Sequence, residues 1–309
     1  MSIRVAVTGK NGQVARSLVE SGPALGIEVA AVGRPELDLT VLDTIQPALA
    51  AVEPDLVVNA AAYTAVDRAE QEPVQAYAIN GTGARAVAAA ACALGVPLIH
   101  LSTDYVFDGS KTTPYVEADP VAPANVYGAS KLAGEQSVAA ATPDHVILRT
   151  AWVYSPFGKN FVRTMLSLAA TRGEVRVVSD QCGCPTYASD IAAAIAAIAQ
   201  NLLNKPHDRQ LRGLFHLAGS GETTWADFAA AIFDFVAANG SPKPVVTPIA
   251  SVDYPTATRR PKNSRLDCSK LARLHGVQLP LWRTSLSACL ERLYGESEYW
   301  SDGVLEEER

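Results

Sequence analysis

The chain is long enough for one large domain and a smaller lobe, with 309 residues, of which 48% are hydrophobic and 19% charged. These proportions are typical of a globular protein and exclude a largely disordered chain. The net charge of −6, without a basic stripe, argues against a protein that binds nucleic acid. The five cysteines are irregularly spaced, which predicts reduced thiols rather than a disulfide framework.

The sequence predicts no membrane span and no signal peptide. The first residues contain no long apolar stretch, and the longest nearly apolar region, residues 86–99, is interrupted by Gly95 and Pro97. We therefore expect a cytoplasmic protein.

Short apolar runs alternate with Ala-rich stretches of helical length over the first 150 residues. Strands are predicted over 3–7, 27–32, 55–60, 97–102 and 145–150, and helices over 13–20, 41–52, 74–94 and 127–140. Strands that are apolar throughout and separated by helices predict a parallel sheet covered on both faces. The expected fold class is α/β, a doubly wound Rossmann-type sheet with a smaller C-terminal lobe.

The second half of the chain is richer in turns, which predicts a different organisation. We expect residues 1–150 to form a dinucleotide-binding domain, with further sheet elements from roughly 175–220. Residues 175–178 and 214–217 are the strand candidates there. The remainder of 151–309 is expected to form mainly a substrate-binding lobe.

A glycine motif follows the first predicted strand directly and opens the first predicted helix. Gly9, Gly12 and Ala15 stand in G-x-x-G-x-x-A spacing. Small residues let the backbone turn tightly and approach a pyrophosphate, while the helix N-terminus supplies N–H donors. An ordinary strand-to-helix turn is the alternative, but the position after the first strand favours a dinucleotide site.

The end of the second predicted strand bears on cofactor choice. It carries Arg34 and no acidic residue, and a guanidinium suits a 2′-phosphate, so we expect NADPH, with NADH as an alternative. Arg34 is also compatible with a solvated turn. Asp38 is an isolated acid that either accepts from an adenine amino group or caps the following helix.

Three residues in the middle of the chain form a candidate proton-transfer site. Thr103, or Ser102 beside it, ends the fourth predicted strand, and Tyr127 and Lys131 lie one turn apart on a predicted helix. A phenol with a pKa near 10 is a slow proton donor at neutral pH, and a neighbouring ammonium should lower that pKa. The alternative is a surface Tyr–Lys pair on an amphipathic helix.

These motifs together resemble the extended short-chain dehydrogenase/reductase family. The resemblance covers nearly the whole chain in family order, and its most specific parts are STDYVFDG and YGASKLAGE. The other segments are GKNGQVA, NAAAYTAVDRAE, RTAWVY, GKNFV, DQCGCPT and RRPKNSRLD. Two features depart from the family pattern. Ala15 stands where the family has its third glycine, and Cys182 and Cys184 stand where the family has no consistent thiol.

The resemblance implies a catalytic set of Thr103, Tyr127 and Lys131, with Lys131 also bonding the nicotinamide ribose. The implied cofactor contacts are Gly9, Asn11, Gly12, Gln13, Val14, Arg34, Asp38, Leu39, Ala62, Tyr63, Thr64, Tyr127 and Lys131. The implied substrate contacts are Thr103, Asp104, Trp152, Asn160, Arg259 and Arg260, with a core position as the alternative for Trp152. Arg259, Arg260, Lys262 and Arg265 form the densest basic cluster of the chain, which suits a pyrophosphate, although a solvated loop is the alternative.

The expected activity is reduction of the C4 ketone of dTDP-4-dehydro-6-deoxy-L-mannose to dTDP-L-rhamnose. The alternatives are another nucleotide-sugar 4-ketoreductase or epimerase, and a non-catalytic subunit like the regulatory subunits of methionine adenosyltransferase. Some relatives are metal-assisted dimers, so a homodimer is one candidate assembly. No metal ligands are identified in this sequence, and we predict no metal site.

Overall fold

Six short segments assemble into one parallel sheet in the computed structural model, which describes residues 2–254 and 256–295. The strands are β1 (Ile3–Thr8), β2 (Ile27–Val32), β3 (Leu56–Asn59), β4 (Leu98–Thr103), β5 (His145–Thr150) and β10 (Gly213–His216). Their order is β2–β1–β3–β4–β5–β10, with every neighbouring pair parallel. The winding reverses between β1 and β3, and such sheets bind ligands outside the carboxyl ends of the strands at that point. The predicted fold class is confirmed.

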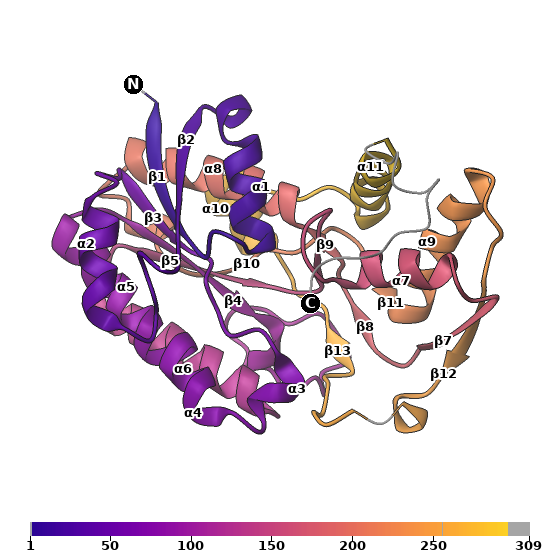
Figure 1. The fold of residues 1–309 in the computed structure, drawn as a ribbon. Helices are drawn as coiled ribbons and strands as arrows, with labels where there is room; N and C mark the ends of the chain where they lie inside the picture. Colours follow the sequence, from indigo (N-terminus) through magenta and orange to yellow (C-terminus); the bar gives the residue numbers. More distant parts are fainter. Residues whose placement is uncertain (1, 255, 296–309) are drawn as a thin grey trace.

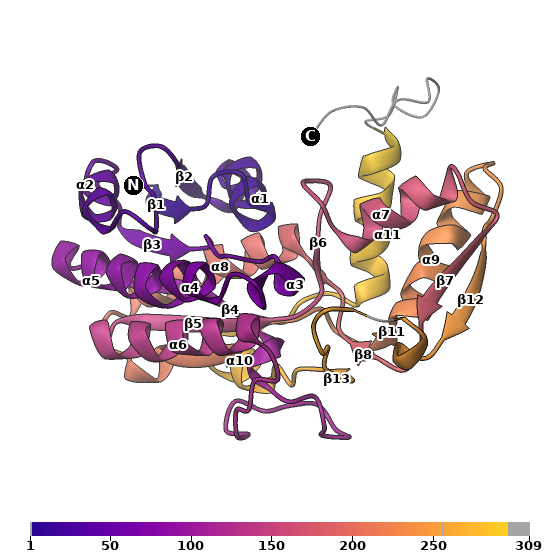
Figure 2. The same cartoon turned by 60° about the horizontal axis from the view of Figure 1, so that its bottom comes forward.

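Helices cover both faces of the sheet (Figures 1 and 2). One face carries α1 (Gln13–Ser21), α8 (Ala188–Asn204) and α10 (Ser269–His275), and the other α2 (Ile45–Ala50), α5 (Ala84–Leu94) and α6 (Val126–Ala141). Two further short helices are α3 (Val66–Ala69) and α4 (Pro73–Tyr77). Single 3-10 turns lie at Pro23–Leu25, Leu42–Thr44, Asp104–Val106, Arg209–Leu211 and Ser251–Asp253.

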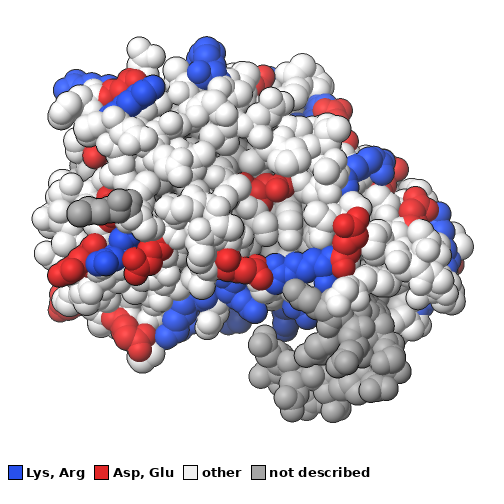
Figure 3. All heavy atoms as spheres, turned by 90° about the horizontal axis from the view of Figure 1, so that it is seen from above, with Lys and Arg blue, Asp and Glu red and all other residues white. Residues whose placement is uncertain are grey.

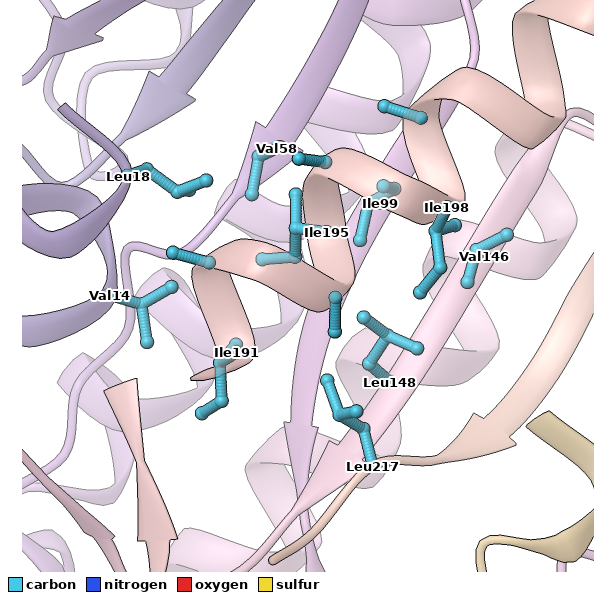
Figure 4. Close-up of a cluster of buried hydrophobic side chains, with 14 of the residues drawn as sticks. Val14, Leu18, Val58, Ile99, Val146, Leu148, Ile191, Ile195, Ile198 and Leu217 are labelled. Carbon is cyan, nitrogen blue, oxygen red and sulfur yellow. The ribbon is translucent and has the colours of Figure 1, made fainter. Parts of the chain in front are cut away.

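The core beneath α8 shows how the sequence pattern places this helix. Ile191, Ile195 and Ile198 follow helical spacing, so they share one face of α8, and all three are fully buried. Figure 4 shows them among strand side chains that include Val146 and Leu148. Burying each such side chain stabilises the fold by about 1.5–3 kcal/mol.

The segment 74–94, predicted as one long helix, is divided in the structure. A π-helical turn (Ala78–Gly83) separates α4 from α5. Gly83 lies against Leu39, where an added Cβ would be 2.8 Å from the Leu39 carbonyl oxygen. Turns of this wider kind often occur at functional sites. Here the turn carries Asn80, whose side chain accepts a hydrogen bond of 2.8 Å from the backbone N–H of Tyr63.

Within residues 151–254 and 256–295, the smaller lobe contains three helices and three short sheets. The helices are α7 (Phe161–Ala169), α9 (Trp225–Ala238) and α11 (Trp282–Gly295). The sheets pair β7 (Glu174–Val178) with β12 (Val245–Ile249), β6 (Val153–Tyr154) with β9 (Thr186–Tyr187), and β8 (Cys182–Gly183) with β11 (Thr223–Thr224) and β13 (Asn263–Ser264).

Of the two strands predicted in the second half of the chain, one joins the main sheet as expected and the other does not. Gly213–His216 joins the main sheet as its edge strand β10, as expected. Strand β7 does not, and pairs with β12 in the smaller lobe. The reason is its alternation: Val175 and Val177 are buried while Glu174 and Arg176 are exposed, which suits a sheet covered on one face only.

The surface carries mixed charge. On the face shown in Figure 3, acidic side chains border the basic ones, with large uncharged areas between them. Among the helices that the structure describes, none is both long enough and apolar enough to cross a membrane.

Candidate active site

A groove of about 850 Å³ opens at the carboxyl edge of the main sheet. The segments that follow β1, β2, β3, β4 and β5 line it together with α6. The predicted residues on its walls are Gly9, Asn11, Gly12, Gln13, Val14, Arg34, Asp38, Leu39, Ala62, Thr64, Thr103, Asp104, Tyr127, Lys131 and Trp152. The fold therefore brings the glycine loop and the Thr–Tyr–Lys set into one groove.

The glycine loop needs its small residues for two reasons. Gly9 has φ +84°, and a Cβ there would lie 3.0 Å from the Cα of Ala61. Gly12 donates a backbone hydrogen bond of 2.8 Å to the Gly9 carbonyl and immediately precedes α1. The loop thus presents bare backbone and a helix N-terminus to the groove, as a pyrophosphate requires.

Gln13 connects this loop to the smaller lobe. Its side-chain oxygen accepts hydrogen bonds from Ser155 Oγ at 2.8 Å and Asn160 Nδ2 at 3.1 Å. Asn160 also caps α7, where its Oδ1 accepts from the Arg163 N–H at 3.2 Å. These bonds occupy the Asn160 side chain within the protein, and its predicted contact with substrate stays a prediction.

The predicted adenosine end of the groove is polar and open. Arg34 is exposed on its wall. Asp38 accepts from the backbone N–H and the hydroxyl of Thr40 at 2.8 and 2.7 Å, so its carboxylate stabilises a local turn, and these bonds lower its pKa. Tyr63, another predicted contact, directs its hydroxyl to Glu72 at 2.6 Å and is not on the groove wall.

Helix α6 approaches the groove closely because of two glycines. A Cβ on Gly128 would lie 2.1 Å from the Tyr105 carbonyl, and one on Gly134 would lie 2.2 Å from the Asn80 carbonyl. Asn125 caps the helix by accepting from the Gly128 N–H at 2.8 Å. This explains why small residues surround the Tyr–Lys pair.

The catalytic candidates meet at the end of β4. Lys131 Nζ donates a hydrogen bond of 2.6 Å to the Leu101 carbonyl. The Thr103 hydroxyl donates to Asp104 Oδ1 at 3.1 Å. Thr103 and the Tyr127 hydroxyl are also hydrogen-bonded to each other. The tyrosine ring packs edge-on against Tyr105, with ring centroids 5.5 Å apart.

The expected effect of Lys131 on Tyr127 is wrong for this structure. Burial raises the pKa of Tyr127 to about 12, the Thr103 hydrogen bond opposes this, and the nearby Asp104 carboxylate adds to it. Desolvation disfavours the charged phenolate, and the Lys131 ammonium is bonded to the Leu101 carbonyl. Tyr127 is therefore protonated at neutral pH, which suits a proton donor.

Two other groups in the groove have shifted pKa values. Burial lowers the pKa of Lys131 to about 8, against the attraction of Glu135. Burial also raises the pKa of Asp104 to about 6, although hydrogen bonds oppose the shift. Two buried oxygens in this region, Asp104 Oδ2 and Thr150 Oγ1, have no hydrogen-bond partner among the described residues.

A second hollow of about 930 Å³ lies beside the groove and contains the predicted substrate arginines. Arg259, Arg260 and Lys262 line it, and Arg260 also pairs with Asp67 at 3.1 Å. Arg265 is different: it bonds Glu222 at 3.0 Å and the Thr112 carbonyl at 2.5 Å. The basic cluster is thus divided, and Arg265 is held within the protein.

A tryptophan pair stands between the two hollows. Trp152 lines the groove, Trp225 lines the second hollow, and their rings stack with centroids 3.5 Å apart. Trp152 has φ +50°, an uncommon conformation for a residue with a side chain. Trp225 was not predicted from the sequence, where only the capping pattern of Thr224 and Asp227 marks the start of its helix.

The free polar atoms fit a dinucleotide. The bare loop at Gly9 and Gly12, the unpartnered Thr150 hydroxyl and the remaining donors of Lys131 all face one groove. In the described part of the chain, no group of three or more His, Cys, Asp or Glu side chains is arranged to hold a metal ion.

A sequence model of the RmlD substrate binding domain matches residues 3–294. The chain belongs to the RmlD substrate binding domain family. This confirms the recognition made from the motifs, because the match spans both the glycine loop and the smaller lobe.

Individual relatives match more than nine-tenths of the chain. A dTDP-4-dehydrorhamnose reductase of Sinorhizobium fredii is 51% identical over 284 residues, covering 92% of this chain and 95% of its own. One of Escherichia coli (strain K12) is 40% identical, covering 94% and 98%. A crystal structure of dTDP-4-dehydrorhamnose reductase from Bacillus anthracis in complex with NADP has TM-score 0.86 at 37% identity, covering 94% of this chain and 100% of that one.

Proposed function

We propose that this protein reduces the C4 ketone of dTDP-4-dehydro-6-deoxy-L-mannose to dTDP-L-rhamnose with NADPH, as a step of dTDP-rhamnose biosynthesis. The observation that carries the proposal is the single groove that holds the glycine loop, Thr103, Tyr127 and Lys131. The Sinorhizobium fredii and Escherichia coli relatives, which cover 92% and 94% of the chain, are named for this reaction, and the Bacillus anthracis relative was crystallised with NADP.

The residues of the chain supply the proton and the orientation. A bound nicotinamide would supply the hydride that reduces C4 of the sugar. Tyr127, protonated because its pKa is raised, gives its proton to the C4 oxygen as that oxygen gains charge. The Thr103 hydroxyl holds the same oxygen in line. Lys131 would hold the nicotinamide ribose of a bound cofactor, and a proton from solvent restores Tyr127.

The two lobes divide the remaining tasks. Residues 1–150 together with β10 bind the dinucleotide, and the rest of the chain, described to residue 295, binds mainly the dTDP-sugar. Asp104 accepts from a sugar hydroxyl, and Trp152 covers the apolar edge of the ring. Arg259 and Arg260 bond the pyrophosphate. A cytoplasmic location, a homodimer and the absence of a metal site stay predictions.

The test follows NADPH absorbance in the presence of the dTDP-keto-sugar. Turnover by the wild type supports the proposal, and its absence would favour a non-catalytic binding subunit. Turnover with other nucleotide 4-keto-sugars at equal kcat/KM would favour a broader ketoreductase. Product stereochemistry, determined by NMR, identifies dTDP-L-rhamnose.

A further inference from the structure

A buried ion pair lies directly behind the catalytic candidates. Glu135 and Arg149 have side chains that are 6% and 3% exposed. Arg149 Nε and Nη2 donate to the two carboxylate oxygens at 2.8 and 2.7 Å, which is a bidentate arrangement. Ser102 Oγ donates to the same carboxylate at 2.5 Å. No role in the reaction follows for Glu135 and Arg149 from the site described above.

The pair is part of a regular contact between α6 and the end of β4. Tyr127, Lys131 and Glu135 are four residues apart on α6, so they lie along one side of the helix. They meet three consecutive residues of β4. Lys131 bonds the Leu101 carbonyl, Glu135 bonds the Ser102 hydroxyl, and Tyr127 is adjacent to Thr103.

Arg149 extends this contact to the next strand. It lies on β5 opposite Ser102, one residue before the pair Thr103–Thr150. Its guanidinium also lies over the Phe107 ring, 4.9 Å from the centroid. Glu135 therefore connects one helix to two strands at the level just below the groove.

Stability is a weak explanation for this pair. Moving two charges out of water carries a desolvation penalty that often equals or exceeds their attraction, and well-packed apolar side chains of similar volume stabilise as well or better. Arg149 Nη1 is also buried without a hydrogen-bond partner among the described residues, which adds to the cost. What the pair supplies, and apolar packing lacks, is a directional contact.

We propose that the Glu135–Arg149 pair positions the catalytic helix, holding α6 in register on the ends of β4 and β5 so that Tyr127 and Lys131 meet Thr103. The proposal rests on the proposed reduction. Glu135 and Arg149 touch neither substrate nor cofactor in it, so they act through Tyr127 and Lys131. A misplacement of about 1 Å in such a site can cost about 100-fold in rate.

The decisive variant replaces both charges, Glu135→Leu with Arg149→Met. Since both charges of the pair are removed together, we expect it to fold with an unfolding free energy equal to or above that of the wild type. Its kcat should fall about 100-fold, with the KM of NADPH and of the keto-sugar within about threefold. Wild-type kcat in a stably folded double variant overturns the proposal.

Matched variants separate positioning from simple loss of a charge pair. The control is the ion pair of Arg212 with Asp144, which are 2.9 Å apart. Asp144 immediately precedes β5, at the end of that strand far from the groove. Replacing both residues of this pair should leave kcat unchanged. Arg149→Lys keeps the charge without the bidentate geometry, so its kcat should lie between that of the double variant and that of the wild type.

If Glu135→Leu with Arg149→Met does not fold, Ser102→Ala replaces it, with an expected fall of about fivefold in kcat. Unchanged kcat in Ser102→Ala then overturns the proposal.

A structural readout keeps this inference distinct from the proposed function. If the wild type turns over no keto-sugar, the reduction fails, but the register can still be measured. A crystal structure of the double variant should show Lys131 Nζ displaced from the Leu101 carbonyl, to which it donates at 2.6 Å in the wild type. An unchanged contact overturns the positioning role regardless of activity.

Discussion

The indole of Trp152 stacks on that of Trp225 with the ring planes 11° apart, and Gly183 lies against the edge of Trp152. A Cβ on Gly183 would be 2.4 Å from Trp152 Cε2. The pair joins residues that are far apart in the chain, one from the segment after β5 and one from the start of α9. It forms the wall where the groove and the second hollow meet, so its integrity should matter for a substrate that extends into both.

Gly183→Ala is expected to displace the Trp152 indole and weaken the stack. An aromatic pair of this kind contributes about 0.5–1.5 kcal/mol, so the KM of the nucleotide-sugar should rise by up to about tenfold while the Kd of NADPH is unchanged. Near-UV circular dichroism reports loss of the stacked indoles. Gly173→Ala is the control, since nothing lies within 4 Å of its Cβ position. Equal effects in the two variants would contradict the interpretation.

Tyr127→Phe should abolish most of the activity without loss of cofactor binding. The phenol is the proposed proton donor, and removing a general acid costs about 10²–10⁴-fold in kcat. NADPH fluorescence titration checks that the groove is intact, because only the hydroxyl is removed. Turnover at the wild-type rate would mean that another group supplies the proton.

The rate of reduction should have a bell-shaped pH dependence. Asp104, with its pKa raised to about 6, loses its negative charge as pH falls through that value, and with it the acceptor for a sugar hydroxyl. Lys131, with its pKa lowered to about 8, loses its positive charge as pH rises through that value. Tyr127 stays protonated throughout this range. The measurement is kcat/KM between pH 5 and 9.

Asp104→Asn assigns the acidic limb of that profile. The amide does not titrate, so the fall in kcat/KM near pH 6 should disappear while the alkaline limb near pH 8 remains. An acidic limb that persists in this variant belongs to a group other than Asp104.

Arg34→Ala should reduce the preference for NADPH. The guanidinium is exposed on the groove wall and is the proposed partner of the 2′-phosphate. A charge-assisted hydrogen bond contributes about 1.5–3 kcal/mol, and screening at an exposed site favours the low end, so the Kd of NADPH should rise about tenfold. The Kd of NADH, measured in parallel, should change by less than about twofold. Equal weakening of both cofactors would indicate a general loss of the loop.

Local sequence patterns were sufficient for the strands of the first 150 residues and for most of the helices between them. Apolar runs of strand length between helical stretches predicted β1 to β5, and the glycine spacing predicted the turn at Gly9. The Tyr127–Lys131 pair was visible because helical spacing alone brings residues four apart onto one side. Strand β7 was assigned to the wrong sheet, because alternation shows that one face is covered but not by what.

The sequence by itself determined the layered α/β fold and which residues stand at the carboxyl edge of the sheet, because periodicity and chain order suffice for both. Only the tertiary structure decided the pKa direction of Tyr127, the stack of Trp152 on Trp225, and the pairing of Glu135 with Arg149. Desolvation depends on everything that surrounds a group, and the stack joins side chains from segments distant in the chain. The spacing of neighbouring residues in the sequence therefore does not determine any of these three features.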